Sequence, residues 1–565
     1  MDGETLKEKT IFSFSLMFLV ILGVVSLLMA WYGPSSSWKF LLAFFPLFVI
    51  LFGVAALRQS ALRMSIIGLV IVIILAVFQF GTPIDVALGA SAYGFVNSFG
   101  ISVSVAMTML MIFVMKEAGA LKTVSQVIKQ QVEGDEMRAL YIGIGFGSFL
   151  SSLGVVTPAL FPPLLIAMGF SPVASIAIAV LGYNATTSFS LLSIPITLPA
   201  TIGQFNPIEL AFKVSLFLPL VSVGFAFALL WIIGGRQSVR KGAVPALICG
   251  LTLAFACLGA LSLDYFSGVQ YIPLEIVGVV AGLCAIMSLL VYQRVRSPTR
   301  EKIKSTDYPS ISQVFRAFSP WIILAVLATV VNVPQIKNWL GGIFGTQPVP
   351  IFANKSVELK IETQIYTWIF VAIIASLATL RPTVKQLKNA TGTWLKRFMG
   401  PFLTYSLYFC IAYVMSYSAM QIANGSLTQS PSYNQLNMNV ILGSTLAAVF
   451  GSGYIFVAAS LGLFGAIVGG SETSSNVLFL NIQKTAAQDL GYGPSGPGFM
   501  TIYASHSVAG GIASAVTPAK INNAVVTIDE PRTTESLIMR KHLVVAITLT
   551  VATGILTGIF VGLGI

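Results

Sequence analysis

The sequence predicts an all-α integral membrane protein that crosses the bilayer about 12 to 14 times. Of its 565 residues 56% are hydrophobic and 9% are charged, whereas a soluble domain carries about 25% charged residues. The mean hydropathy is +0.87, and apolar stretches of about 20 residues, the length of a membrane-spanning helix, recur throughout. The longest internal polar stretch, around 297–316, is too short for a soluble catalytic domain. We therefore expect a polytopic membrane protein and not an enzyme.

The apolar stretches place the spans in chain order. They are 11–32, 39–57, 64–81, 96–116, 173–200, 211–234, 242–263, 272–293, 317–333, 365–380, 398–418, 437–458, 499–527 and 543–563. The first stretch is too long for a signal-peptide core and lacks a small-residue cleavage site, so we expect it to be an uncleaved span. Two further segments, 141–168 and 459–490, are interrupted by proline or by polar residues.

The basic residues predict the orientation. Of 32 Lys and Arg, 25 fall in segments that one topology places on the same side. These are the N-terminus with Lys7 and Lys9, Arg58 with Arg63, and the segments 116–138, 236–241, 294–316, 381–397 and 532–541. Cytoplasmic loops carry the basic excess, so the N-terminus is expected in the cytoplasm of a cell-membrane protein. The net charge of +12 is then explained by topology and by contact with the lipid bilayer. No nucleic-acid partner is expected.

The same topology predicts a re-entrant hairpin. Both ends of the stretch between Lys116 and Gly235 are expected to be cytoplasmic, and the spans 173–200 and 211–234 already make two crossings. The segment 141–168 must then enter and leave on one side. Pro162 and Pro163 in its middle support a hairpin because proline interrupts a helix. Two short full spans would satisfy the same parity.

An internal repeat is indicated by loosely recurring motifs. The segment 114–121 recurs at 414–421, and 168–172 is echoed at 490–494. The loop of the first copy, 117–138, is basic, whereas that of the second, 419–436, has no Lys or Arg, so the copies are expected to be inverted. Inverted repeats with interrupted helices are an architecture of secondary transporters; chance similarity among Gly/Ser/Ala-rich helices is the alternative.

The repeat divides the chain into five regions, which we describe by their expected contents. They are 1–83 (N-terminal spans), 84–235 (first repeat, hairpin 141–168, interrupted helix 173–200), 236–380 (connecting spans), 381–542 (second repeat, hairpin 459–490, interrupted helix 499–527) and 543–565 (C-terminal span).

The most polar run at bilayer depth is Gly470 to Asn476, which we expect to be extended or unwound. Irregular backbone is tolerated there only when protein or a watery cavity surrounds it. A carboxylate at this depth is costly and marks an ion or proton pathway, so Glu472 is the candidate for proton coupling; a hydrogen-bonded structural carboxylate is the alternative. The hydroxyls and amide that follow, Thr473, Ser474, Ser475 and Asn476, are candidate substrate ligands at a helix N-terminus, or simple caps.

Further candidates come from the predicted interrupted helices and the first hairpin. The substrate-binding candidates are Asn184, Thr186, Thr187, Ser188, Ser151, Ser152 and Ser505. Ser and Thr also simply pack helices together in membranes. His506 could relay protons because histidine titrates near physiological pH, or it could be structural. Lys520 could neutralise a substrate carboxylate, but snorkelling to the interface is the favoured interpretation.

Cysteine and histidine usage excludes other site classes. The four cysteines lie in apolar segments, which indicates buried packing and neither a disulfide framework nor a metal site. The chain has 2 histidines, so a histidine-based metal centre is not expected. No cofactor is predicted apart from a coupling ion, which is a proton, with sodium as the alternative.

The run from Gly470 to Asn476, continued by 477–479 and 485–488, resembles the L-lactate permease family. The segments 316–320 and 146–150 and the Gly510-Gly511 pair are also similar, and the resemblance extends from about residue 85 to the end. It implies uptake of lactate, glycolate or a related 2-hydroxy acid by proton symport. The chain departs from the family where Ser151 replaces an acidic residue of the first hairpin, and where Ser514 corresponds to a lysine.

The sequence thus favours a secondary transporter that imports a small organic anion, most simply a monocarboxylate, with a proton. A sodium-coupled carrier for another organic anion and a passive anion facilitator are the alternatives. An intramembrane enzyme is disfavoured because the serines have no evident base. The oligomeric state is not predicted.

Overall fold

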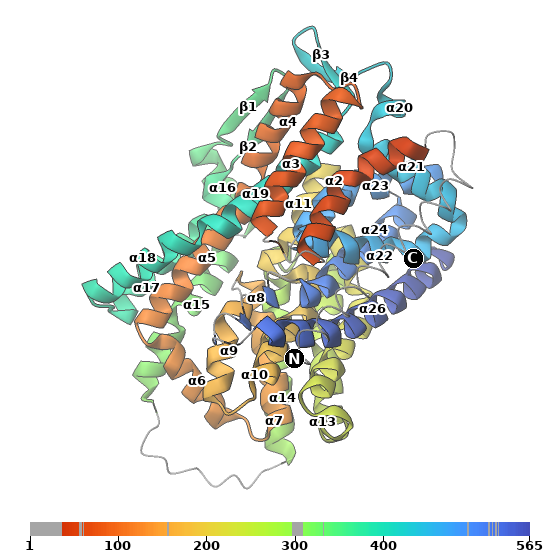
Figure 1. The fold of residues 1–565 in the computed structure, drawn as a ribbon. Helices are drawn as coiled ribbons and strands as arrows, with labels where there is room; N and C mark the ends of the chain where they lie inside the picture. Colours follow the sequence, from red (N-terminus) through yellow and green to blue (C-terminus); the bar gives the residue numbers. More distant parts are fainter. Residues whose placement is uncertain are drawn as a thin grey trace, which may run out of the picture.

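The computed structural model describes residues 37–565 apart from 56–58, 60, 155–156, 297–308, 332, 470, 494–495, 518–519, 522–523, 526–527, 529 and 531. Within these residues the fold is helical, with two short β-hairpins (Figure 1). The predicted span 11–32 and the predicted cytoplasmic N-terminus lie outside the described residues.

The elements up to the first β-hairpin are all helices. They are α2 (Ser37–Ala55), α3 (Ala61–Phe78), α4 (Ile84–Asn97), α5 (Phe99–Glu117), α6 (Ala120–Gln131), α7 (Asp135–Leu140), the π-helix η1 (Tyr141–Phe146), α8 (Gly147–Ser152), α9 (Thr157–Ala167), α10 (Pro172–Leu181), the 3-10 helices η2 (Gly182–Phe189) and η3 (Leu191–Ser193), α11 (Ile194–Gly203), α12 (Pro207–Ser215), α13 (Leu218–Ser267), η4 (Leu274–Ile276), α14 (Val277–Arg296), α15 (Ile311–Val331) and α16 (Pro334–Phe344).

The remaining elements include both hairpins. They are β1 (Pro348–Phe352), β2 (Lys355–Glu358), η5 (Ile361–Thr363), α17 (Ile365–Leu380), α18 (Val384–Arg397), α19 (Met399–Ser416), β3 (Met420–Ala423), β4 (Ser426–Gln429), α20 (Tyr433–Leu436), α21 (Met438–Phe450), η6 (Gly451–Gly453), α22 (Tyr454–Gly469), α23 (Glu472–Asp489), α24 (Pro497–Ala513), η7 (Ser514–Val516) and α26 (Arg532–Gly562).

Eight of the described helical segments are long and apolar enough to cross a membrane. They are Phe99–Glu117, Pro172–Gly203, Leu218–Ser267, Leu274–Arg296, Ile311–Val331, Val384–Ser416, Met438–Ile467 and Leu537–Gly562. Shorter apolar helices at Trp38–Ile50, Leu62–Phe78 and Ile365–Leu380 fall on three predicted spans. A multi-pass helical membrane protein is therefore confirmed. This number of candidate spans is lower than the predicted 12 to 14, partly because several predicted spans are short helices or are joined into one helical segment.

The helix α13 contains most of the predicted span 211–234 and all of 242–263. Its backbone leaves the helical region at Gly234 and at Gly235, where φ is 60°. Gly250 lies against the backbone of Val223, and Gly242 lies against Leu230. This pairing means that the two halves of α13 pack antiparallel, so the chain reverses at the glycine pair, which tolerates positive φ.

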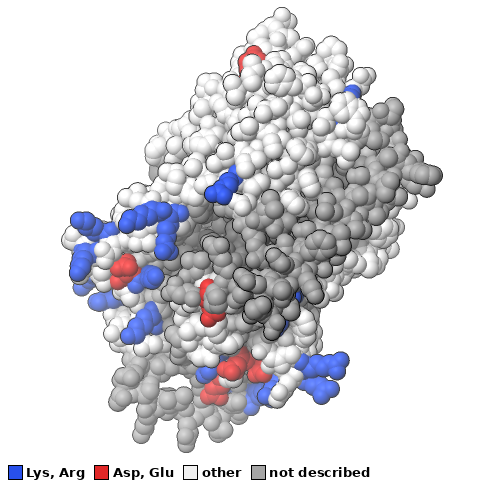
Figure 2. Space-filling view, in the orientation of Figure 1, with Lys and Arg blue, Asp and Glu red and all other residues white. Residues whose placement is uncertain are grey.

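Basic side chains gather away from the β-hairpins. Figure 2 shows Lys and Arg over α18 and at the reversal of α13, whereas the region of the hairpins carries few charges on this face. The exposed residues concerned are Lys385, Lys388, Lys396 and Arg397 of α18 and Arg236, Arg240 and Lys241 of α13. The two groups belong to segments that the charge distribution predicts to be cytoplasmic.

The predicted hairpin 141–168 covers η1, α8 and α9. The chain turns around Gly154, where φ is 87°, a value that glycine adopts without strain. Pro162 and Pro163 lie inside α9, so they do not interrupt a helix as expected. Transmembrane helices tolerate proline because neighbouring groups satisfy the freed backbone. The hydroxyl of Thr157 donates to the carbonyl of Ala179 (3.2 Å) and ties α9 to α10.

The predicted interruption of 173–200 is present. After α10 the chain tightens into η2, and four residues there and in η3 adopt positive φ: Thr187 (41°), Leu191 (50°), Leu192 (53°) and Ser193 (58°). Such values are uncommon for residues with a side chain. They persist only where the surroundings over-determine the backbone, as at functional sites.

The second predicted interruption is displaced. We expected unwinding at 505–511, but α24 is continuous to Ala513 and gives way to the 3-10 turn η7 only at Ser514. The polar side chains in this stretch are bonded within α24 or to adjacent helices, so the backbone has no reason to unwind there. The run after Gly470 was also expected to be irregular. Ser471 is extended (φ −157°, ψ 155°), but α23 begins directly at Glu472.

The two β-hairpins were not predicted. Strand β1 pairs antiparallel with β2, and β3 pairs antiparallel with β4. The side-chain amide of Asn354 donates to the carbonyl of Leu427 (3.1 Å), and the amide N–H of Leu427 donates to Asn354 Oδ1 (2.9 Å). These two bonds fasten the hairpins to each other at one end of the molecule (Figure 1).

The buried core has two main parts. The larger cluster of apolar residues includes α13, α14 and α24, and the second joins α2, α3, α19 and α21. Glycine allows the closest contacts: Gly462 of α22 lies against the backbone of His506 in α24, and Gly282 of α14 lies against the backbone of Phe149 in α8. Small residues at helix interfaces are the usual way to bring backbones together in a membrane.

Candidate functional site

The start of α23 builds a capped, buried helix N-terminus. The Ser471 hydroxyl accepts a hydrogen bond from the backbone N–H of Ser474 (3.1 Å) and lies 2.8 Å from the Ser474 hydroxyl. Glu472 occupies the first helical position and is 5% exposed. A carboxylate in the first turn is favoured by the positive end of the helix dipole. The location of Glu472 at a buried helix start therefore has a local physical basis.

Ser507 of α24 is the centre of the hydrogen-bond network around this carboxylate. Its hydroxyl donates to Glu472 Oε1 (3.2 Å) and accepts from the side-chain amide of Asn476 (2.7 Å). The hydroxyls of Ser507 and Ser188 lie 2.9 Å apart. The amide of Asn476 also donates to the carbonyl of Pro195 (2.8 Å) at the start of α11. The network joins α23 and α24 to the interrupted segment of the first half.

Gly511 allows this approach. A methyl group at Gly511 would come within 2.7 Å of Thr187 Cβ and 2.9 Å of Glu472 Oε2. Such contacts are shorter than atoms tolerate, so a side chain there would push η2 away from α24. The absence of a side chain is a requirement of the packing.

A second network surrounds His506. Gln483 Nε2 lies 2.9 Å from His506 Nδ1 and also donates to the carbonyl of Ala458 (3.2 Å), while Tyr454 donates to Gln483 Oε1 (2.7 Å). These partners fix the amide with its nitrogen toward the ring, so Nδ1 is the acceptor and the ring proton is on Nε2. Nε2 then faces the Ser475 hydroxyl at 3.2 Å. The ring therefore has a hydrogen-bond partner on both nitrogens.

The other predicted site residues differ in their hydrogen-bond partners. Four of them bond to their own segment: Asn184 to the carbonyl of Val180 (2.6 Å), Thr186 to Tyr183 (3.0 Å), Ser151 to Ser148 (3.2 Å) and Ser505 to Ile502 (2.7 Å). Within the described part of the chain, the buried atoms Thr187 Oγ1, Ser152 Oγ and Asn476 Oδ1 have no hydrogen-bond partner. Thr473 is buried at the first turn of α23. Free polar capacity is therefore present at Thr187 and Asn476, on both sides of the junction.

Lys520 turns inward, contrary to the favoured prediction that it snorkels to the interface. Its ammonium donates to the hydroxyl of Ser514 (2.8 Å) and lies 5.4 Å from the centroid of the Tyr183 ring. It also interacts electrostatically with Glu472. The turn at η7 directs this side chain to buried partners, which local sequence does not reveal.

Sequence reasoning missed several members of the two networks. Ser507 lies two positions from a predicted ligand, and Tyr503 donates to the backbone carbonyl of Asn476 (2.7 Å). Gln483 could have been found, because Glu472, Asn476 and Gln483 follow helical spacing and form a polar stripe on α23. For Tyr503 and Ser507 the sequence holds no comparable signal.

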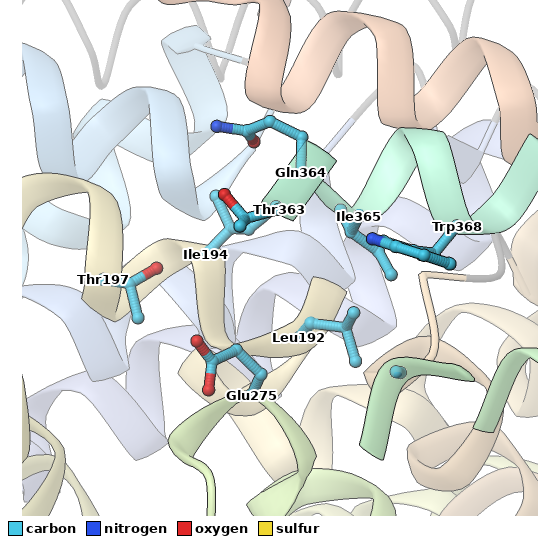
Figure 3. A pocket seen from close by; sticks show the side chains of 9 residues that line it. Leu192, Ile194, Thr197, Glu275, Thr363, Gln364, Ile365 and Trp368 are labelled. Atoms are coloured by element: carbon cyan, nitrogen blue, oxygen red, sulfur yellow. The ribbon is translucent and has the colours of Figure 1, made fainter. Parts of the chain in front are cut away.

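An open cavity of about 120 Å³ lies beside the same interrupted segment (Figure 3). It is lined by Leu192, Ile194, Thr197, Glu275, Ala328, Thr363, Gln364, Ile365 and Trp368. Its Glu275 forms an ion pair with Lys337 (3.1 Å). The cavity borders η3 and α11, which directly follow Thr187 and Ser188, but the buried network around Glu472 does not line it. We place the candidate chemistry at the network, where charged and polar groups converge.

Comparison with known proteins gives a coherent set of matches. A family model described as L-lactate permease matches residues 39–564. The chain is 25% identical over 502 residues to the glycolate permease GlcA of Escherichia coli (strain K12), covering 80% of this chain and 84% of that protein. It is 23% identical over 510 residues to the L-lactate permease of Salmonella typhi, covering 81% and 86%. It is also 23% identical over 503 residues to the L-lactate permease of Bacillus subtilis (strain 168), covering 80% and 84%.

Among solved structures, the YdaH transporter of Alcanivorax borkumensis, described as having an unusual topology, covers 90% of this chain and 99% of its own at a TM-score of 0.42 and 14% identity. That score is too low to carry a conclusion about the fold.

Proposed function

This chain belongs to the L-lactate permease family, and from that premise we propose that it imports L-lactate, glycolate or a related small 2-hydroxy monocarboxylate across the cell membrane by proton symport. Family membership makes it a transporter and not an enzyme, in agreement with the expectation from composition. The curated relatives it matches are permeases for lactate and glycolate, and the chain spans most of their length.

The position of Glu472 is the observation that carries the coupling proposal. Glu472 is buried at the junction of α23, α24 and η2, and hydroxyl groups are its hydrogen-bond partners. An ionisable group inside a membrane is costly and is retained for ion or proton pathways. A carboxylate that takes up a proton as the anion enters would keep the loaded site from gaining negative charge. Because the ring of His506 is already engaged on both nitrogens, we assign proton coupling to Glu472 alone.

We further propose that the two halves are inverted repeats that bind the anion between them. The chain is interrupted in each half, at η2–η3 in the first and at η7 in the second, and we assign one hairpin to each half, 141–168 and 459–490. The hydroxyl of Thr187, the amide of Asn476 and the start of α23 are the proposed ligands for the carboxylate and the 2-hydroxyl. The N-terminus and the basic faces of α13 and α18 are assigned to the cytoplasm, in line with the excess of basic residues in cytoplasmic loops.

Uptake into proteoliposomes tests the proposal. We expect radiolabelled lactate to accumulate above its external concentration when the lumen is alkaline, and a protonophore to abolish accumulation. Replacing sodium by potassium should change nothing. Accumulation that follows a sodium gradient instead would establish the sodium-coupled alternative. Flux that equilibrates without accumulating under either gradient would establish a passive facilitator.

A further inference from the structure

The ammonium of Lys520 lies among buried residues without an anionic partner at contact distance. Its neighbours are the Ser514 hydroxyl (2.8 Å) and the face of the Tyr183 ring (5.4 Å), and both Ser514 and Tyr183 are buried. Within the described part of the chain, Lys520 and Glu472 interact electrostatically but form no ion pair within 4.0 Å. An ammonium has three donors, and a buried charge is costly unless it is paired. Lys520 is therefore balanced by Glu472 only across a distance and retains donors for an anion in direct contact.

Free hydrogen-bonding groups for an anion also lie near Glu472. Thr187 Oγ1 and Asn476 Oδ1 are buried and have no partner among the described residues. Gly511 lies against Thr187 and Glu472 Oε2, and the adjacent Gly510 lies against Asn476 Oδ1 and Glu472, so the two free groups face the same glycine pair of α24. A hydroxyl can donate to a carboxylate, and an amide oxygen can accept from a 2-hydroxyl group. The free groups match the functional groups of a 2-hydroxy acid.

We propose that Lys520 is the cation that binds the carboxylate of the transported anion, and that Glu472 competes with the anion for it. This inference rests on the proposed function. With Glu472 ionised, the carboxylate and the ammonium neutralise each other and the empty site carries no net charge. With Glu472 protonated, Lys520 is free and an entering anion restores neutrality. Each anion is thereby accompanied by one proton.

Among the described residues, three phenols face this pair, and His542 of α26 lies next to Ser514, where its Nδ1 bonds to the carbonyl of Ala515 (2.7 Å) and its charged neighbour is Lys541. The phenols of Tyr183 of η2, Tyr503 of α24 and, next to Ser471, Tyr405 of α19 surround the pair. None of them carries a charge that competes with Lys520 for the anion at physiological pH. His506 faces Ser475 and Gln483 instead. The competition therefore involves Glu472 and Lys520.

The test compares Lys520→Gln with Lys484→Gln in proteoliposomes. Lys484 lies on α23 and makes no hydrogen bond or ion pair among the described residues, so the control removes the same charge elsewhere. We expect K520Q to raise the half-saturating lactate concentration about 10- to 100-fold, the effect of losing a charge-assisted bond, and K484Q to match the wild type. Inhibition of lactate uptake by the neutral analogue lactamide should be unchanged in K520Q, whereas a merely structural defect would weaken both ligands together.

Further outcomes separate the two proposals. An unchanged half-saturation in K520Q would overturn the inference, while a wild-type protein that takes up no lactate would overturn the proposed function. If K520Q does not give a monodisperse protein, Lys520→Arg carries the test: it keeps the charge and should keep the preference for lactate over lactamide, and loss of that preference would overturn the inference.

The competition itself is tested by pH in lactate exchange. The wild type should bind lactate more weakly as pH rises, because ionised Glu472 then occupies Lys520. Glu472→Gln should bind lactate with little pH dependence. An equal pH slope in both proteins would contradict the competition.

Discussion

Replacing Ser507 by alanine is the sharpest test of the network that joins the two halves. The substitution removes three hydrogen bonds, to Glu472 Oε1, from the amide of Asn476 and with the hydroxyl of Ser188. Interhelical hydrogen bonds in membrane proteins contribute about 0.6 kcal/mol each, so the three together stabilise the fold by about 2 kcal/mol. The side chain is fully buried, and water cannot replace the lost partners. We expect S507A to lower the free energy of unfolding by this amount.

The measurement is unfolding of the purified protein in mixed micelles by increasing SDS, followed by circular dichroism. Ser505→Ala is the matched control, because Ser505 is equally buried on the same helix and bonds only to the carbonyl of Ile502. Alanine favours a helix interior over serine by about 0.5 kcal/mol, so S505A should be nearly neutral. Equal destabilisation by S507A and S505A would show that the network does not connect the halves, and the reasoning would be refuted.

The remaining predictions concern coupling, packing and the surface. Glu472→Gln should abolish accumulation driven by a pH gradient and retain lactate exchange, because glutamine carries no titratable proton; undiminished accumulation would remove Glu472 from the mechanism. Gly511→Ala should reduce transport at least about tenfold and lower stability by about 1–3 kcal/mol through overpacking against Thr187, measured by uptake and SDS unfolding. Gly342→Ala, where an added methyl meets no atom within 4 Å, is its control, and a neutral G511A would contradict the packing. Lys337→Gln should lower the free energy of unfolding by less than about 1 kcal/mol in the same assay, because the lysine side chain of its ion pair with Glu275 is 43% exposed. A larger loss of stability would mean that the ion pair anchors the structure.

The sequence predicted members of the candidate site in both halves, Thr187 and Ser188 in the first and Glu472 and Asn476 in the second. Glu472 and Ser188 were both named, since a carboxylate and a polar break stand out in apolar sequence. Ser507, which bonds to both, was not, because one serine among several in α24 has no local mark. His506 was a candidate for proton transfer, and the partners of its ring, Gln483 and Ser475, belong to another helix.

Of the two predicted helix interruptions, one lies where it was expected and the other does not. The interruption at Thr187 was predicted because small polar residues cluster in the middle of a span. An equally polar cluster at 505–511 is continuous helix, because partners on neighbouring elements satisfy its side chains. Local composition therefore marks where a helix can be interrupted, and the surrounding helices determine whether it is.

The sequence by itself determined that this protein is a multi-pass helical membrane transporter, because transfer of apolar residues into lipid depends on local composition and adds up along the chain. It also identified the family and the buried carboxylate. Only the tertiary structure decided which polar groups meet: Ser188 and Ser507 are 319 positions apart in sequence and their hydroxyls lie 2.9 Å apart. Hydrogen bonds and charge pairs of this kind depend on the relative placement of packed helices, which no local pattern specifies.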